Sequence, residues 1–408
     1  MGSKRHIVLG DAKKSFILVD KGKLERTIDF GRITMIGNRE PWIDTTKAVS
    51  LIGIISVHAI LDGDESIFLT GFVIPVFFIL YGVTHNNEKH RLNMKQCTLN
   101  RFRTLMIPYI LLSVCQLVIY SFSYPIIDGG YTPLDYFVWQ LYGNGPIGRT
   151  SHLWFLRTLF FVTIVFLLVD RYLHDKPSIL RFSVIILSPG FGVMIQSVMG
   201  VELLPWGIDS VFIALSFVMI GNEIARHRDI SSWNSSPSID IIVVPLSMIF
   251  VVWLSIFNGF VNIGGSLYGQ SIYLHMITGV LGTYNLSVLC YYLCNVQIVK
   301  NLFSNFNKYS QVIYEIHPLL MYFNSILIWK VFAIPPDNLI FVFNLIFGIS
   351  VSWLVSSQII CRSRVLRIAF LGKSTKDSPS IEIACHDEPH EKETEIALKQ
   401  EHVKQDHK

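Results

Sequence analysis

Long apolar blocks recur through the middle of this 408-residue chain and constrain its fold more than any other feature. Most are about 17–25 residues long, the length at which an α-helix crosses a hydrocarbon core of about 30 Å. A helix satisfies its own backbone polar groups in lipid, and the blocks lack the alternation of a β-barrel strand. Only 16% of the residues are charged, against about a quarter in soluble domains. The chain is therefore predicted to be an all-α, polytopic integral membrane protein.

The apolar blocks predict about ten transmembrane helices, and the charges between them predict the orientation. The blocks are residues 45–60, 67–84, 105–124, 152–170, 182–200, 208–222, 239–257, 270–292, 310–330 and 338–360. Cytoplasmic loops of membrane proteins are enriched in Lys and Arg. The even-numbered connections hold twelve such residues, namely Lys89, Arg91, Lys95, Arg101, Arg103, Arg171, Lys176, Arg181, Arg226, Arg228, Lys300 and Lys308. The odd-numbered connections hold only Arg149, with Lys330 at a helix edge, so the even connections and both termini are expected in the cytoplasm.

The chain divides into three parts. Residues 1–40 are a polar cytoplasmic leader, 41–362 the membrane body, and 363–408 a charged cytoplasmic tail that is expected to be disordered, because it is too poor in apolar residues to bury a core. In the leader, short apolar stretches at 16–19 and 24–30 flank Asp20-Lys21-Gly22-Lys23 and predict a hairpin. The six cysteines lie on the cytoplasmic side or within helices, so we expect neither a disulfide framework nor a metal site.

Two ionisable residues of the first block, Lys47 and His58, are eleven positions apart. At about 100° per residue, that spacing leaves them within about 20° on one helix face and about 16 Å apart along its axis. Ionisable side chains inside a membrane are costly and therefore indicate function. The alternative is that Lys47 anchors the helix at the interface and that His58 is a hydrogen-bonded core histidine. Spacing alone leaves both interpretations open.

Two arginines, Arg101 and Arg103, precede the third block. Paired guanidinium groups can hold phosphates through charge-assisted hydrogen bonds, and they equally mark the cytoplasmic side of a helix. His275 falls in the eighth block and Glu223 directly follows the sixth, and for both we expect a role in joining helices.

Other candidates lie in the fourth and ninth blocks. His152 and Trp154 begin the fourth block, as interfacial residues often do. Arg157 lies about five residues inside the fourth block, where it needs a partner or an aqueous cavity. Glu315 and His317 lie in the ninth block two positions apart, on different helix faces, and this disfavours a shared metal ion.

Five short motifs follow one another through the membrane body. They are Arg39-x-x-Trp42-Ile43-Asp44-x-x-Lys47 followed by His58, Phe72-x-x-Pro75-Val76-Phe77-Phe78-Ile79-Leu80-Tyr81-Gly82, Arg101-x-Arg103-Thr104-Leu105-Met106-Ile107-Pro108-Tyr109, His152-Leu153-Trp154-Phe155-Leu156 and Ile313-Tyr314-x-x-His317-Pro318. In this order, over residues 39–362, they resemble acyltransferase family 3. These are integral membrane enzymes, some of them fucose 4-O-acetylase-like, that O-acetylate bacterial surface polysaccharides. The chain departs from the family pattern at Tyr81-Gly82, where Ser-Gly is usual, and in the Arg-x-Arg spacing.

The resemblance implies an enzyme of the inner membrane that moves an acyl group, commonly acetyl, from acyl-CoA to a hydroxyl of a cell-surface glycan or glycolipid. It implies His58 as the catalytic residue, with Lys47, Arg101 and Arg103 holding the CoA phosphates. A hydroxyl is a weak nucleophile at neutral pH, so the step requires a neutral imidazole as general base. Alternatively, His58 accepts the acyl group and passes it on.

The resemblance also suggests supporting residues and partners. His152, Trp154, Arg157, Glu315 and His317 are expected to bind the acceptor or to support the site. Acyl-CoA is the expected donor substrate, with the lipid bilayer and a glycan or lipid-linked saccharide as partners, and neither a permanently bound cofactor nor nucleic acid is expected. The competing functions are a transporter or flippase of a glycan-related solute and a structural membrane subunit. Transporters often contain repeat halves, which this sequence lacks.

Overall fold

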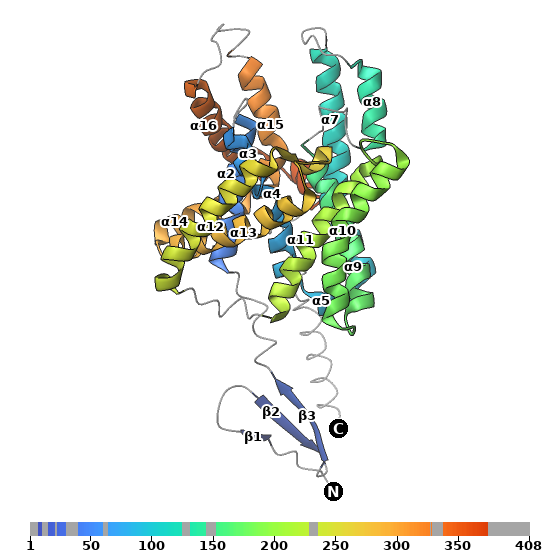
Figure 1. Cartoon of the computed structure of the whole chain (residues 1–408), viewed down its shortest axis with the longest axis vertical. Coiled ribbons are helices and arrows are strands. Elements are labelled where there is room, and N and C mark those ends of the chain that lie inside the picture. Colours follow the sequence, from blue (N-terminus) through green and yellow to red (C-terminus); the bar gives the residue numbers. More distant parts are fainter. Residues whose placement is uncertain are drawn as a thin grey trace, which may run out of the picture.

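The computed structural model describes the backbone of residues 7–9, 15–20, 23–29, 40–59, 64–124, 131–143, 152–227, 236–326, 328 and 338–373. From residue 40 onward, side chains are described at these positions except 64–65, 326 and 338–340. Helices make up nearly all of this part of the chain (Figure 1), which confirms the all-α prediction.

The helices follow one another from the end of the leader to residue 371. They are α2 (Pro41–Ala59), α3 (Asp64–Thr70), α4 (Val73–Thr84), α5 (Asn87–Leu92), α6 (Met94–Arg101), the π-helical turn η2 (Phe102–Met106), α7 (Ile107–Ser123), α8 (Pro133–Tyr142), α9 (Trp154–Leu173), α10 (Ser178–Met199), α11 (Ile208–His227), α12 (Pro237–Asn258), α13 (Ile272–Leu293), α14 (Gln297–Lys308), α15 (Ser310–Ile326), α16 (Asn338–Val355) and α17 (Arg364–Leu371). Short 3-10 turns, η3 (Pro205–Gly207) and η5 (Ile263–Gly265), and a second π-helical turn, η7 (Ser356–Ile360), connect some of them.

Strands form two small sheets. In the leader, β2 (Ser15–Asp20) pairs antiparallel with β3 (Lys23–Asp29), which confirms the predicted hairpin, and β1 (Ile7–Leu9) pairs with the other edge of β2. A two-residue ladder, β4 (Val261–Asn262) with β5 (Leu267–Tyr268), encloses η5 between α12 and α13.

Seven of the described helical segments are long and apolar enough to cross a membrane. They are Ser66–Thr84, Met94–Ser123, Ser178–Met199, Pro205–His227, Pro237–Asn258, Ile272–Leu293 and Phe341–Ile360. Each coincides with a predicted block, which confirms a polytopic membrane protein, while the total of ten stays a prediction. The remaining three blocks are helical as α2, α9 and α15. Of these, α2 and α9 contain charged residues and α15 has only 17 residues. These three helices carry His58, Arg157 and His317.

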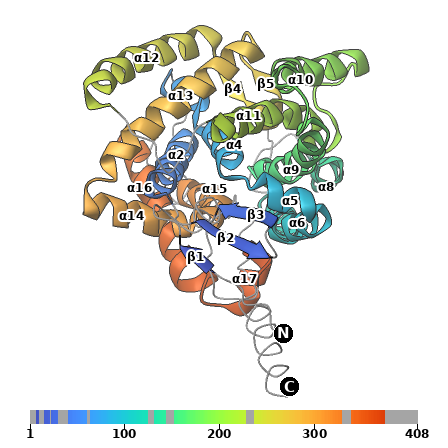
Figure 2. The ribbon, with the colours of Figure 1, turned by 90° about the horizontal axis from the view of Figure 1, so that it is seen from below.

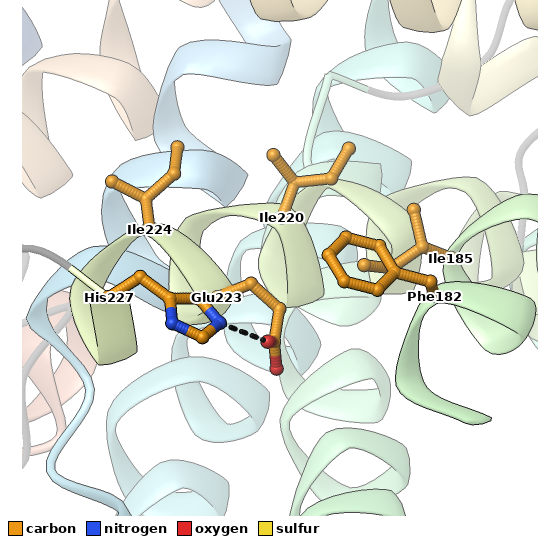
Figure 3. A pocket seen from close by; sticks show the side chains of 6 residues that line it. All are labelled: Phe182, Ile185, Ile220, Glu223, Ile224 and His227. Carbon is orange, nitrogen blue, oxygen red and sulfur yellow. Dashed lines mark ion pairs between the residues drawn. The ribbon is translucent and has the colours of Figure 1, made fainter. Parts of the chain in front are cut away.

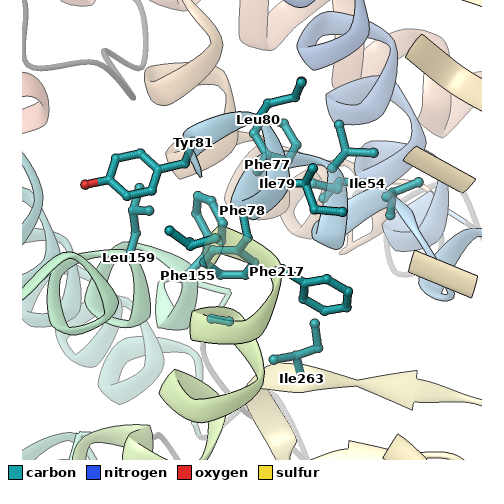
Figure 4. Packing of buried hydrophobic residues seen from close by; sticks show 14 of the residues in the cluster. Ile54, Phe77, Phe78, Ile79, Leu80, Tyr81, Phe155, Leu159, Phe217 and Ile263 are labelled. Carbon is teal, nitrogen blue, oxygen red and sulfur yellow. The ribbon is translucent and has the colours of Figure 1, made fainter. Parts of the chain in front are cut away.

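The core of the bundle is built around α4, which lies near the middle of the view in Figure 2 and contacts α2, α11 and α13. The segment is apolar on all sides because it is buried on all sides, and Phe77 and Phe78 are at most 2% exposed. Phe155 of α9 packs on Phe78 with ring centroids 5.2 Å apart, and Phe217 of α11 lies in the same cluster (Figure 4). This packing fixes the neighbours on which the candidate site depends.

The outer surface of the bundle is apolar over several helices. Val114 and Phe122 on α7, Leu187 on α10, and Ile241 and Trp253 on α12 are all exposed. An aqueous protein rarely leaves so large an apolar surface uncovered. Lipid is therefore the solvent that suits these faces.

Candidate active site

Three histidines from distant parts of the chain meet in the membrane body. His58 lies in the last turn of α2, His152 just before α9, and His317 in α15. The ring centroids of His58 and His317 are 5.2 Å apart, and those of His152 and His317 are 6.3 Å apart. The structure thus brings three of the predicted candidates together, with His317 between the other two.

Local hydrogen bonding determines which nitrogen of His317 carries the proton. Its Nδ1 lies 3.0 Å from the carbonyl oxygen of Ile313, so Nδ1–H donates to that oxygen. Nε2 is then the unprotonated nitrogen, and it is buried without a hydrogen-bond partner among the described residues. A buried acceptor left without a donor is costly, so His317 presents a lone pair that a neighbour or a substrate can use.

The two close histidines differ in accessibility. His317 is fully buried, and Tyr314 beside it is 4% exposed. The side chain of His58, by contrast, is exposed. His58 is therefore the member of the pair that a small molecule can reach, with His317 behind it.

His152 attaches to α15 next to the backbone position that Pro318 weakens. Proline has no N–H, so the carbonyl of Tyr314, four residues earlier in α15, loses its usual donor and the helix is weakened there. At this point Nε2 of His152 lies 2.9 Å from the adjoining carbonyl oxygen, that of Glu315, and donates to it. The Tyr314 hydroxyl in turn donates to the carbonyl of His152. These two hydrogen bonds join His152, just before α9, to α15, a few residues before Pro318.

Lys47 shares an unbroken helix with His58, since α2 runs from Pro41 to Ala59. The predicted distance of about 16 Å along one helix axis therefore applies. The Lys47 side chain is buried. At that end of α2, which packs against α14, the Asn307 amide donates to Asp44 at 2.9 Å. One helix thus carries a buried cation towards one end and an accessible imidazole at the other.

Arg101 and Arg103 diverge instead of forming a pair. Arg101 is buried, with its guanidinium 5.6 Å from the ring centroid of Tyr81, whereas Arg103 is exposed. The π-helical turn η2 begins between them, at Phe102. Arg103 is thus the more accessible of the two to a phosphate.

Another histidine pair, His85 and His90, was missed by sequence reasoning. Nδ1 of His90 lies 3.1 Å from Nε2 of His85, and both rings are buried. The His85 ring also packs edge-on to Phe166 of α9 and to Tyr81. Their spacing of five residues does not align them on a helix; the break between α4 and α5 lets them meet. Burial, then the charges of His90 and Arg101, lower the pKa of His85 well below its usual value. The ring is therefore neutral at pH 7.

Arg157 belongs to a separate polar cluster. It is fully buried in α9, near the ionisable residues Tyr109 and Asp209. Asp209 of α11 accepts hydrogen bonds from Gln196 at 2.8 Å and from Ser266. Arg157 thus lies in a buried region that also holds the acidic residue Asp209, and its expected partner stays a prediction.

Trp154 packs away from this cluster, against the backbone of η5. A Cβ added to Gly264 would lie 2.4 Å from the indole, so only glycine fits beneath it. The indole also packs edge-on to Phe155, with ring centroids 6.1 Å apart. Trp154 therefore has a packing role that its sequence position did not indicate.

The carboxyl group of Glu315 turns towards another part of the bundle. The Gln311 amide donates to its Oε1 at 3.0 Å and also contacts the carbonyls of Thr104 in η2 and Phe370 in α17. Its Oε2 is buried without a hydrogen-bond partner in the described part of the chain. The backbone of Glu315 thus serves the histidine site, while its side chain lies near the α15–α17 contact.

Glu223 joins helices, as predicted. It accepts from Arg181 of α10 at 2.6 Å and pairs with Arg226 and His227 of its own helix at 3.7 and 3.4 Å. Beside it, a cavity of about 300 Å³ is walled by apolar side chains of α10 and α11, among them Phe182 and Ile220 (Figure 3). Arg181 and Arg226 thus pair with one oxygen of the carboxylate, and His227 lies nearest the other.

Two further predictions concern His275 and metals. His275 of α13 packs edge-on to Phe217 of α11, with ring centroids 5.6 Å apart, which agrees with a helix-joining role. No group of three or more His, Cys, Asp or Glu residues that could hold a metal ion occurs among the described residues.

Comparison with known proteins bears on the membrane body as a whole. A family model described as an acyltransferase domain matches residues 40–357, well over half of the chain. No curated protein and no solved structure matches it. The matched range begins one residue before α2 and ends inside η7, so it includes all three clustered histidines.

Proposed function

The chain belongs to acyltransferase family 3, and on that premise we propose that it moves an acyl group from acyl-CoA to a hydroxyl of a cell-surface glycan or lipid-linked saccharide. Membrane acyltransferase activity in general follows from the family and from the seven apolar helices. We further propose that the donor is acyl-CoA, that the transferred group is acetyl and that the acceptor is a glycan. We also propose that the protein lies in the bacterial inner membrane.

The contact between His58 and His317 carries the proposal. His58 is the accessible ring, and we assign it the role of general base. In the transfer, the acceptor oxygen forms an ester bond with the acyl carbon, the thioester C–S bond breaks, and the hydroxyl proton passes through the imidazole to the departing CoA thiolate. Positioned proton transfer of this kind contributes about 10²–10⁴-fold to rate. The Nε2 lone pair of His317 is suited to accept the single N–H of neutral His58, which leaves the other nitrogen of His58 free to act as the base.

The donor is polyanionic, which suits basic residues at the cytoplasmic mouth. Lys47 lies on the same helix as His58, about 16 Å away along the axis, so phosphates held near Lys47 leave room for the thioester arm to extend to the imidazole. Arg103 is exposed and can contribute to the same anion. Arg101 is buried over Tyr81, and we assign it a role in supporting the phosphate site formed by Lys47 and Arg103.

Radiolabelled acetyl-CoA tests the proposal directly. Membranes containing wild type or His58→Ala are incubated with the label, and the glycolipid and polysaccharide fractions are counted. Size-exclusion elution confirms that the variant is folded. Label that appears with wild type and is lost with His58→Ala supports the proposal. Equal labelling by both removes His58 as catalyst. If wild type transfers no label from any acyl-CoA, the transferase proposal is wrong, and uptake of a labelled solute then tests the transporter.

A further inference from the structure

Gln116 is the only carboxamide side chain in α7, a helix of otherwise apolar, aromatic or small residues. Its neighbours Val114 and Val118 are about half exposed, at 55% and 47%, as expected of a lipid-facing helix. An amide in such surroundings is costly unless it is hydrogen-bonded. Gln116 is only partly exposed, and its Nε2 lies 3.2 Å from Nδ1 of His152.

This bond determines the tautomer of His152. The amide N–H of Gln116 donates to Nδ1, which therefore carries the lone pair, and the ring proton is on Nε2. From Nε2 the proton is donated to the carbonyl of Glu315 at 2.9 Å. Both nitrogens of His152 are thus occupied by protein groups, and neither is available to a substrate.

The carbonyl that receives this proton lies at the weak point of α15. Pro318, one residue after His317, leaves the Tyr314 carbonyl without its usual helical donor, and His152 donates to the carbonyl of the next residue, Glu315. His317 lies two residues after Glu315, so a change in this attachment moves the ring that contacts His58. The chain of contacts runs from Gln116 through His152 to the backbone that carries His317.

We propose that Gln116 is a positioning residue for the histidine site, acting through His152 to hold the proline-containing helix α15 so that His317 stays against His58. The inference rests on the proposed function. It also gives His152 a different role from the acceptor contact that its sequence position suggested, because its two ring nitrogens are used to join α7, α9 and α15.

Kinetics of Gln116→Met test the proposal, since methionine keeps the length of the side chain but has no N–H. We expect kcat to fall about tenfold to hundredfold, in line with the effect of a sub-ångström to 1 Å misplacement of a catalytic group, with KM for donor and acceptor unchanged. The matched control is Gln358→Met, at an exposed glutamine outside the site, which should behave as wild type. An unchanged kcat in Gln116→Met, or a raised acceptor KM with normal kcat, would overturn the proposal.

Substitutions of His152 separate a positioning role from a contact with substrate. His152→Gln retains an amide N–H that can reach the Glu315 carbonyl, so it should keep more activity than His152→Leu. Equal loss in both variants would contradict the positioning role.

A readout without turnover distinguishes this proposal from the proposed function. In ¹⁵N-histidine-labelled protein, the signal that His152→Gln removes should report protonation at Nε2, and Gln116→Met should change that signal. If it does so although wild type transfers no acyl group, the contact is real and the proposed function is wrong. An unchanged signal rejects the role of Gln116.

Discussion

Substituting Gly221 by alanine should push α11 away from α4, the helix at the centre of the bundle. A Cβ at position 221 would lie 1.9 Å from the carbonyl oxygen of Ile79. Gly82 of α4 makes the same close approach from the other side, because a Cβ there would lie 1.9 Å from the carbonyl oxygen of Val218 in α11. Both partners are backbone atoms in helices, so no side chain can rotate away. The two helices approach closely through this glycine pair, as small residues allow in membrane proteins.

The expected magnitude follows from that distance. Cβ atoms in proteins keep at least 3.0 Å from other heavy atoms, so the backbones must separate by about 1 Å or more. Overpacking of this kind costs about 1–3 kcal/mol, and the better helix propensity of alanine returns at most about 1 kcal/mol. Because the clash is with a rigid backbone, we expect a net loss of about 2 kcal/mol for Gly221→Ala. Gly82→Ala should lose a similar amount.

Thermal unfolding of the purified protein in detergent measures the effect, with Gly190→Ala as the matched control. Gly190 is also helical, but its nearest obstacle is the Tyr273 hydroxyl at 2.8 Å, the end of a side chain that can move. We expect Gly190→Ala to unfold close to wild type and Gly221→Ala clearly earlier. If Gly221→Ala is as stable as Gly190→Ala, the close backbone approach is not a feature of the protein.

Two further predictions concern charge. His85, just past the Ser66–Thr84 span, has a lowered pKa when folded, so the unfolded chain binds its proton first. Stability should be full above pH 6.5 and fall below it by up to about 1.4 kcal/mol per pH unit; His85→Gln should flatten this slope, and an identical slope would contradict the assignment. Asp170→Asn removes a partner of Arg226 in a largely buried ion pair and should cost about 3 kcal/mol in denaturation experiments. Asp175 is 93% exposed, so Asp175→Asn should leave the stability unchanged. Equal losses of stability in Asp170→Asn and Asp175→Asn would refute the claim that the buried ion pair matters more.

The membrane helices could be predicted well because one physical signal, the length of apolar segments, specifies them. Each of the seven segments that can cross a membrane coincides with a predicted block. The blocks that became α2, α9 and α15 carry ionisable residues for a reason that is visible only in three dimensions. Their polar residues face one another inside the bundle, as the contact of His58 with His317 illustrates.

The site could be predicted in its members but not in its arrangement. His58, His152 and His317 were recognised from motifs in chain order, yet helical spacing relates residues within one helix and cannot bring α2 to α15. The pair Arg101 and Arg103 looked equivalent in sequence, and the π-helical turn that starts between them separates a buried side chain from an exposed one. Gln116 was passed over because a single glutamine in an apolar helix has no partner that sequence alone can name.

A double-mutant cycle tests whether His58 and His317 work together in acyl transfer. Acyl transfer is measured for wild type, His58→Gln, His317→Gln and the double variant, all confirmed to be folded. Groups that act as a unit have strongly non-additive effects. We therefore predict that each single variant loses about 10²–10⁴-fold in kcat and that the double variant is no worse than the poorer single one. Losses that multiply, or a His317→Gln variant with full activity, would contradict the claim that the two histidines work together.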